Sequence, residues 1–265
     1  MRLGFGRGFF AIAAASLASL SLAYGGFGPS GPLPGWIPWR DMWVYLSALL
    51  LLAASAGLCF PRTALPGALT IGAYQVVWAL LGTPPILSNP LSIGAWYGFC
   101  EAMTSLVGAW ILYAQLRRQS QGAGMPIASE RAVRVAQVLF GLTCVFYGSS
   151  HFVYADYTAS MVPSWLPGRL GLAYFTGLSH IAAGVGIVTG ILPRLAATLE
   201  AIMMSLFGLL VWVPSFWAQP RPPWAMPAQN QWSELVVNLV LAASACIVAT
   251  SLRNRRWGFG PRSRA

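Results

Sequence analysis

The chain has 265 residues, of which 57% are hydrophobic and only 8% are charged, and its mean hydropathy is +0.63. A soluble globular domain carries roughly 25% charged residues, so this composition excludes a water-soluble protein and indicates an integral membrane protein. The formal net charge is +10, and every one of the 16 basic residues is an arginine. These arginines stand in short clusters between apolar runs and not along one polar face, so we exclude nucleic acid as a partner.

Eight apolar stretches are long enough to cross a lipid bilayer as helices, which takes about 18 to 22 residues each. We place them at residues 8–25, 43–60, 64–83, 93–115, 133–155, 170–191, 195–214 and 232–252. The first stretch follows Arg2 and Arg7 as the apolar part of a signal peptide would, but we count it as a retained span. The predicted fold class is therefore an all-α, polytopic membrane protein with eight transmembrane helices.

Arginine positions predict the orientation, because short cytoplasmic loops carry an excess of basic residues. With eight spans, most arginines fall on one side of the membrane, and only Arg40, Arg169 and Arg221 fall on the other. Most tryptophans lie near that other side, as an aromatic belt does. We expect a bacterial inner membrane location with both termini in the cytoplasm.

The chain contains an internal repeat. Pro34-Gly-Trp-Ile-Pro38 is echoed by Pro163-Ser-Trp-Leu-Pro167, and Phe60-Pro-Arg-Thr-Ala64 by Leu192-Pro-Arg-Leu-Ala196. Each half holds four spans, so the two halves share one orientation and should be related by an axis along the membrane normal. The predicted division is a first four-helix half at 1–115, a cytoplasmic linker at 116–131 and a second four-helix half at 132–265.

The second half carries an ordered set of short motifs: Arg134, Gly148-Ser-Ser-His151, Val162-Pro-Ser-Trp-Leu-Pro167, Thr176-Gly-Leu-Ser-His180 and Gly190-Ile-Leu-Pro-Arg194. From residue 134 to about 250 this order resembles the DoxX family of small four-helix membrane proteins, and the first half resembles it more weakly. The resemblance implies two fused DoxX-like bundles. It also implies a link to redox assemblies, because some members are associated with thiosulfate:quinone oxidoreductase.

The sequence departs from that family pattern at two positions. The first helix of the pattern often ends with a Lys where this chain has His151, and its second helix has a Glu where this chain has His180. These are the only two histidines, and an ionisable residue within a span indicates a functional site. A rise of about 1.5 Å per residue puts them roughly 6 Å and 15 Å below their helix ends, which is level within the error of the boundaries.

Three uses of this histidine pair stay open. The first is a hydrogen-bonded structural pair that replaces the charge pair of the family. The second is a Zn or Cu site, which would need further ligands, although no Cys or carboxylate is obviously level with both histidines. The third, which we favour, is bis-histidine ligation of a b-type haem iron, with Gly148, Gly177 and Gly184 clearing space for the ring.

Two further observations bear on the haem prediction. A shift of 129 residues maps His151 to Leu22 and His180 to Leu51, so only one site per chain is expected. Arg169, on the outer side, would suit a haem propionate or a lipid headgroup, and simple interfacial anchoring is its other interpretation.

Three glutamates also fall within spans, namely Glu101, Glu200 and Glu234. Each is a candidate proton carrier. For Glu234 we favour an interfacial carboxylate, and for Glu200 a structural pair with Arg194.

The sequence therefore predicts a b-type haem electron-transfer protein, a quinone-linked subunit of a respiratory or redox complex with other membrane or periplasmic redox subunits as partners. The alternative is a non-catalytic membrane subunit or assembly factor in which the histidines hold helices together. The sequence does not identify catalytic residues.

Overall fold

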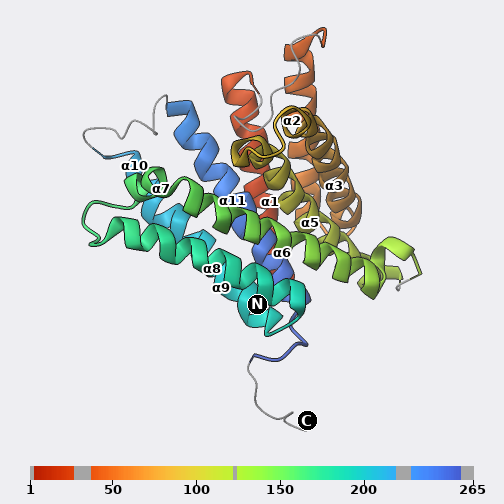
Figure 1. Cartoon of the computed structure of the whole chain (residues 1–265). Coiled ribbons are helices and arrows are strands. Elements are labelled where there is room, and N and C mark those ends of the chain that lie inside the picture. The colour runs from red at the N-terminus through yellow and green to blue at the C-terminus, as the bar shows by residue number, and fades with distance from the viewer. Residues whose placement is uncertain (1–2, 27–36, 122–123, 219–227, 258–265) are drawn as a thin grey trace.

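The computed structural model describes residues 3–26, 37–121, 124–218 and 228–257, and this part of the chain is all-helical (Figure 1). The eight predicted spans are confirmed as long apolar helices. They are α1 (Leu3–Tyr24), α2 (Arg40–Cys59), α3 (Ala64–Leu81), α5 (Ile93–Gln121), α6 (Glu130–Val153), α8 (Arg169–Thr189), α9 (Pro193–Phe207) and α11 (Ala228–Ser251). The seventh span continues from α9 through a π-helical segment, η2 (Gly208–Trp212), into α10 (Val213–Ser215).

Short elements connect some of the spans. They are α4 (Thr83–Ser88), α7 (Ala155–Met161) and a 3₁₀ turn, η1 (Pro126–Ala128). The predicted linker is shorter than expected, because α5 continues as helix through Gln121. Ser129 ends the linker by capping α6, where its hydroxyl accepts a hydrogen bond of 3.1 Å from the Ala132 amide. Trp36, Arg221 and much of the predicted outer loops lie outside the described residues.

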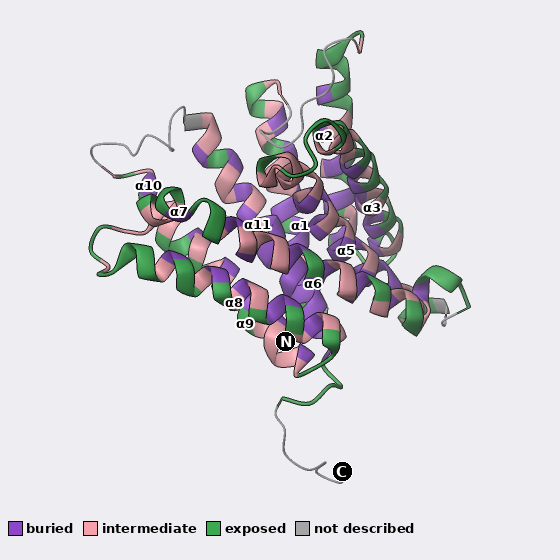
Figure 2. Cartoon of the chain, viewed as in Figure 1, coloured by how far each residue is buried: buried purple, intermediate pink, exposed green. Residues whose placement is uncertain are grey.

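Helix packing follows the same order in both halves of the chain. In the first half α1 packs on α2, α2 on α3 and α3 on α5, and in the second half α6 packs on α8, α8 on α9 and α9 on α11. Between the halves, α1 packs on α11, α6 on α5, and α5 on α11. An axis between α5 and α11 would generate this pattern, and these two are the most buried spans (Figure 2). The division into two domains stays a prediction that this packing favours.

Burial follows the repeat at the level of single residues. The buried residues of α2 are Val44, Ala48, Leu51, Ala54, Ser55 and Leu58, and those of α8 are Ala173, Gly177, His180, Ala183, Gly184 and Ile187. Each residue of the second set lies 129 positions after its counterpart in the first. The helix that carries His180 therefore turns the same face inward as its counterpart in the first half, with different chemistry on that face.

Candidate functional site

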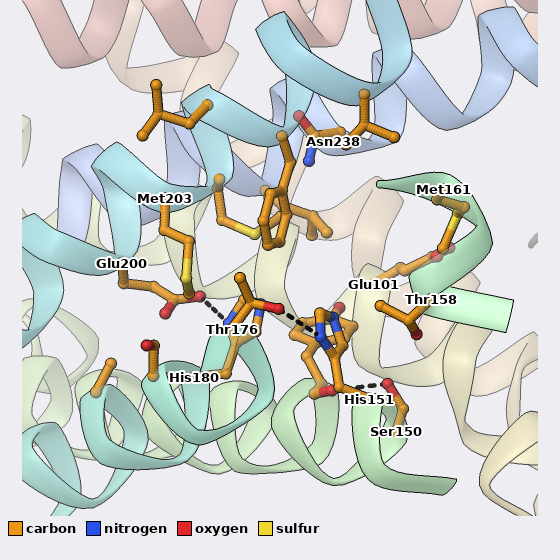
Figure 3. Close-up of a pocket in the computed structure, with 18 of the residues that line it drawn as sticks. Glu101, Ser150, His151, Thr158, Met161, Thr176, His180, Glu200, Met203 and Asn238 are labelled. Atoms are coloured by element: carbon orange, nitrogen blue, oxygen red, sulfur yellow. Dashed lines mark hydrogen bonds and ion pairs between the residues drawn. The ribbon is translucent and has the colours of Figure 1, made fainter. Parts of the chain in front are cut away.

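A cavity of about 1440 Å³ lies in the second half of the chain, with one wall from α5 and the α3–α4 corner of the first half. Most of its lining is apolar. The imidazole, carboxyl and amide side chains that line it are those of His151, His180, Glu101, Glu200, Glu234 and Asn238, and all of these except Glu234 are labelled in Figure 3. Both histidines and all three intramembrane glutamates singled out from the sequence therefore border one cavity.

His180 and Glu200 form a buried pair at this cavity. The His180 Nδ1 atom lies 2.7 Å from Glu200 Oε1, and the two side chains are each only 2% exposed (Figure 3). A carboxylate accepts, so the Nδ1 atom of His180 donates this hydrogen bond, and in the neutral imidazole the Nε2 atom is the acceptor. Glu200 Oε2 is buried without a hydrogen-bond partner. The pair therefore offers two hydrogen-bond acceptors, His180 Nε2 and Glu200 Oε2, that no hydrogen bond within the pair satisfies.

His151 is held by the neighbouring helix α8. Its Nδ1 atom lies 3.0 Å from Thr176 Oγ1 (Figure 3). The same atom lies 3.2 Å from the Ala173 carbonyl oxygen. A carbonyl oxygen only accepts, so Nδ1 carries the proton here as well, and Nε2 is again the acceptor. The two imidazole rings lie together, with centroids 5.2 Å apart and planes at 73°. The sequence-based expectation that both rings reach one depth agrees with this distance.

The three glycines expected to make room for a haem have another role. A Cβ on Gly148 would lie 2.5 Å from the Gly177 carbonyl oxygen, and a Cβ on Gly177 would lie 2.7 Å from the His151 Cβ. A Cβ on Gly184 would meet the Gly141 carbonyl oxygen. These residues let the backbones of α6 and α8 touch, as small residues do between transmembrane helices. None of them lines the cavity.

A haem held by both histidines does not fit this arrangement. A porphyrin with one axial imidazole on each face needs a gap between the two rings, and here the rings are in direct edge-to-face contact. Arg169, the predicted propionate partner, is exposed at the start of α8 and does not line the cavity. The two histidines are therefore not placed as the axial ligands of one haem iron.

The haem prediction has a direct spectroscopic test. With α6 and α8 in contact, we expect protein purified with haem supplied during expression to show no Soret band that depends on His151 or His180. The absorbance spectrum of the wild type and of the His151→Ala with His180→Ala variant would measure this. A low-spin Soret band in the wild type that disappears in the variant would overturn the arrangement described above.

The partner of Glu200 differs from the sequence-based expectation. Arg194, the predicted partner, instead donates to the Arg253 carbonyl oxygen at 2.7 Å and lies 4.0 Å from the Trp257 ring centroid. From the sequence, no carboxylate was expected to lie level with both histidines. In the structure, however, Glu200 lies level with His180 and bonds to it. Counting from the turn between α8 and α9 would have shown this, since His180 lies about 13 Å and Glu200 about 10 Å from that turn at the helical rise.

Within the described residues, no three His, Cys, Asp or Glu side chains cluster as a metal site would require.

The cavity opens sideways between α8 and α9. Phe175, Val185, Leu199 and Ile202 line the cavity and are also exposed on the outside of the bundle, from 48% to 65%. In a membrane this surface faces lipid. The cavity therefore reaches the apolar outer surface of the bundle at α8 and α9.

The π-helical segment η2 and Asn238 form another part of the wall. Single π-helical turns within α-helices often mark functional sites, because they displace the following side chains. Leu210, Val211 and Trp212 of this turn line the cavity. Across from the turn, Asn238 is 5% exposed, and its Oδ1 atom is buried without a hydrogen-bond partner. Asn238 thus adds a further buried acceptor without a hydrogen-bond partner to the cavity wall.

The first half has an apolar version of this site. The shift of 129 residues places Leu51 at the position of His180 and Ile71 at the position of Glu200, and these two side chains are 1% and 0% exposed. The same packing order is therefore built once with two apolar residues and once with a polar pair. The polar pair in the second half is therefore not a requirement of the packing order alone.

Comparison with known proteins gives one match. A family model described as a domain of unknown function, DUF8561, matches residues 140–249. The match falls within the second half and spans both histidines, Glu200 and Asn238. It is not a match to the DoxX family, so that resemblance stays an interpretation of the motifs. No curated protein and no solved structure matches the chain.

Proposed function

We propose that this chain is a membrane-embedded subunit of a quinone-linked redox complex, and that its cavity binds a quinol. The observation that carries the proposal is the His180–Glu200 pair, buried at 2.7 Å and lining a cavity that opens toward lipid. Burying an ionisable pair at membrane depth is unfavourable in free energy, so such a pair points to a functional site. The apolar pair in the first half shows that packing alone does not demand it.

The pair is suited to accept a proton from a ligand hydroxyl. Glu200 holds the Nδ1 proton of His180, so Nε2 is the acceptor, and the carboxylate stabilises the imidazolium that forms. A quinol becomes a quinone by losing two protons and two electrons. His180 takes one proton and the second passes to the part of the cavity lined by Glu101 and Glu234. The two electrons leave one at a time, to two equivalents of a one-electron carrier in a partner subunit.

The shape and chemistry of the cavity support a quinol over a small polar substrate. Its walls are largely apolar, which suits an aromatic ring and a prenyl tail, and its lateral opening suits a ligand dissolved in the bilayer. The motif resemblance to the DoxX family, with its association with thiosulfate:quinone oxidoreductase, supports the same ligand class.

A second candidate function is a non-catalytic subunit or assembly factor with structural histidines. Two hydrogen bonds favour this function. His151 on α6 bonds to Ala173 on α8, and His180 on α8 bonds to Glu200 on α9. In that case the cavity would have no specific affinity for a quinol.

Titration of the purified protein with decylubiquinol separates the two candidates. Tryptophan fluorescence is a suitable readout, because Trp212 lines the cavity. We expect saturable quenching at one site per chain. A short-chain quinone should compete with decylubiquinol for this site, and a saturated alcohol of equal tail length should not. Quenching that stays linear with concentration would mean partition into detergent only and would contradict the proposal.

The proposed orientation, with the arginine-rich loops and both termini in the cytoplasm, has its own test. Ser120 is exposed near the end of α5, beside the loop that joins the two halves. In a background in which the exposed Cys59 is replaced by Ser, we expect a cysteine at position 120 to react with an impermeant maleimide only in inverted membrane vesicles. Labelling only in right-side-out cells would reverse the orientation.

A further inference from the structure

A second cavity, of about 240 Å³, lies where α5 and α11 end and α6 begins. It is separate from the quinol cavity, and the two share no lining residue. Its polar lining residues include Gln115, Arg118, Thr250, Ser251, Arg253 and Asn254. Two cations therefore border a small polar cavity in a chain with very few charges.

The charge of these arginines is not neutralised by the described part of the chain. No carboxylate lines the cavity, and neither Arg118 nor Arg253 forms an ion pair with a described carboxylate. The Arg118 guanidinium is fixed by a hydrogen bond of 2.7 Å from its Nε to the Ala128 carbonyl oxygen. Its Nη2 atom is buried without a partner. A buried cationic donor without an acceptor is unfavourable, and an anion in the cavity would satisfy it.

We infer that this cavity binds a phosphate group, either as a free anion or as the headgroup of an anionic phospholipid. The planar guanidinium matches phosphate oxygens with paired donors, and hydroxyl and amide groups of the lining add neutral ones. The candidate spans end at Ser120 in α5 and Ser251 in α11, so the cavity lies at the level of lipid headgroups. Basic pockets between transmembrane helices at this level are typical phospholipid headgroup sites.

Native mass spectrometry of the full chain, released from a neutral detergent, tests the inference. Phosphatidylglycerol, phosphatidylcholine and inorganic phosphate are the three probes. We expect the wild type to retain one phosphatidylglycerol, and the Arg118→Gln with Arg253→Gln variant to bind it at least about tenfold more weakly, since each arginine contributes charge-assisted hydrogen bonds. If inorganic phosphate competes with phosphatidylglycerol, the cavity is a free-anion site. If inorganic phosphate does not compete, the cavity is a lipid headgroup site.

The matched control removes two arginines from the same end of the bundle without touching the cavity. Arg62 and Arg255 are exposed and do not line it, so Arg62→Gln with Arg255→Gln should bind phosphatidylglycerol as the wild type does. If loss of the Arg118 bond to Ala128 prevents folding, Arg253→Gln alone still tests the site, because its side chain is exposed. Equal phosphatidylglycerol affinity in the wild type and the cavity variants would overturn the inference.

Discussion

Replacing the buried pair by its counterparts from the first half, His180→Leu with Glu200→Ile, is expected to abolish quinol binding and leave the fold intact. Leu51 and Ile71 are fully buried at the corresponding positions, so the architecture accepts this apolar pair. Apolar replacement of both members of a buried polar pair is often close to neutral for stability. The binding loss then follows from removal of the proton acceptor, and decylubiquinol titration measures it.

The single variants should behave differently from the double variant. His180→Leu leaves the Glu200 carboxyl group buried without its partner, which costs about 3 kcal/mol or more when the group stays charged. Glu200→Ile leaves the His180 Nδ1 proton without an acceptor, at about 1 to 3 kcal/mol. Unfolding titrations with sodium dodecyl sulfate should therefore show each single variant to be less stable than the double variant.

A control pair away from the cavity distinguishes the loss of a proton acceptor from a general loss of polar contacts. Gln137 donates a hydrogen bond of 3.0 Å to the Ser251 hydroxyl, and neither residue lines the cavity that holds the His180–Glu200 pair. Gln137→Leu with Ser251→Ala should keep decylubiquinol affinity. Wild-type affinity in the His180→Leu with Glu200→Ile variant would rule out the proposed role of the pair and favour a structural one.

Gly148→Ala should destabilise the protein by about 1 to 3 kcal/mol, although alanine is the better helix former. Its Cβ would lie 2.5 Å from the Gly177 carbonyl oxygen and 2.9 Å from the Ile181 amide nitrogen. Both are backbone atoms of α8, so the contact is relieved only if the two helices separate. That separation would also displace His151 from Thr176 and Ala173. The free energy of unfolding in mixed micelles is the measurement.

Gly171→Ala provides the matched control on α8. No atom lies within 4 Å of the Cβ that this substitution adds, so helix propensity alone decides its effect. We expect unchanged or slightly higher stability, by up to about 1 kcal/mol. If Gly148→Ala were as well tolerated as Gly171→Ala, α6 and α8 would not be in contact at this level, and a gap wide enough for a cofactor would exist between them.

The length and position of the apolar runs in the sequence were enough to predict the spans. Each of the eight expected stretches overlaps an observed candidate span, with ends that differ by a few residues. The repeat was also visible, and the burial of α2 and α8 follows the same shift of 129 residues that mapped His180 to Leu51. These features are local or periodic along the chain, so they require no knowledge of which helix faces which.

The chemistry of the site was only partly predictable. Two histidines in spans pointed to the region of the second half in which the structure brings His151, His180 and Glu200 to one cavity. The partner itself was missed: Glu200 was expected to pair with Arg194 and instead bonds His180. An error of three residues in a helix boundary moves a side chain by about 5 Å along the axis, which is enough to exchange one partner for another.

The sequence by itself determined an eight-span helical membrane protein with an internal repeat and one polar region in its second half. Tertiary structure decided how that region is used. The spacing of Gly148, Gly177 and Gly184 is compatible with a gap for a cofactor or with direct helix contact, and only the distance between α6 and α8 separates these cases. Helix separation and rotation depend on every neighbouring helix at once, which is why one-dimensional spacing could place the histidines together but could not show what lies between them.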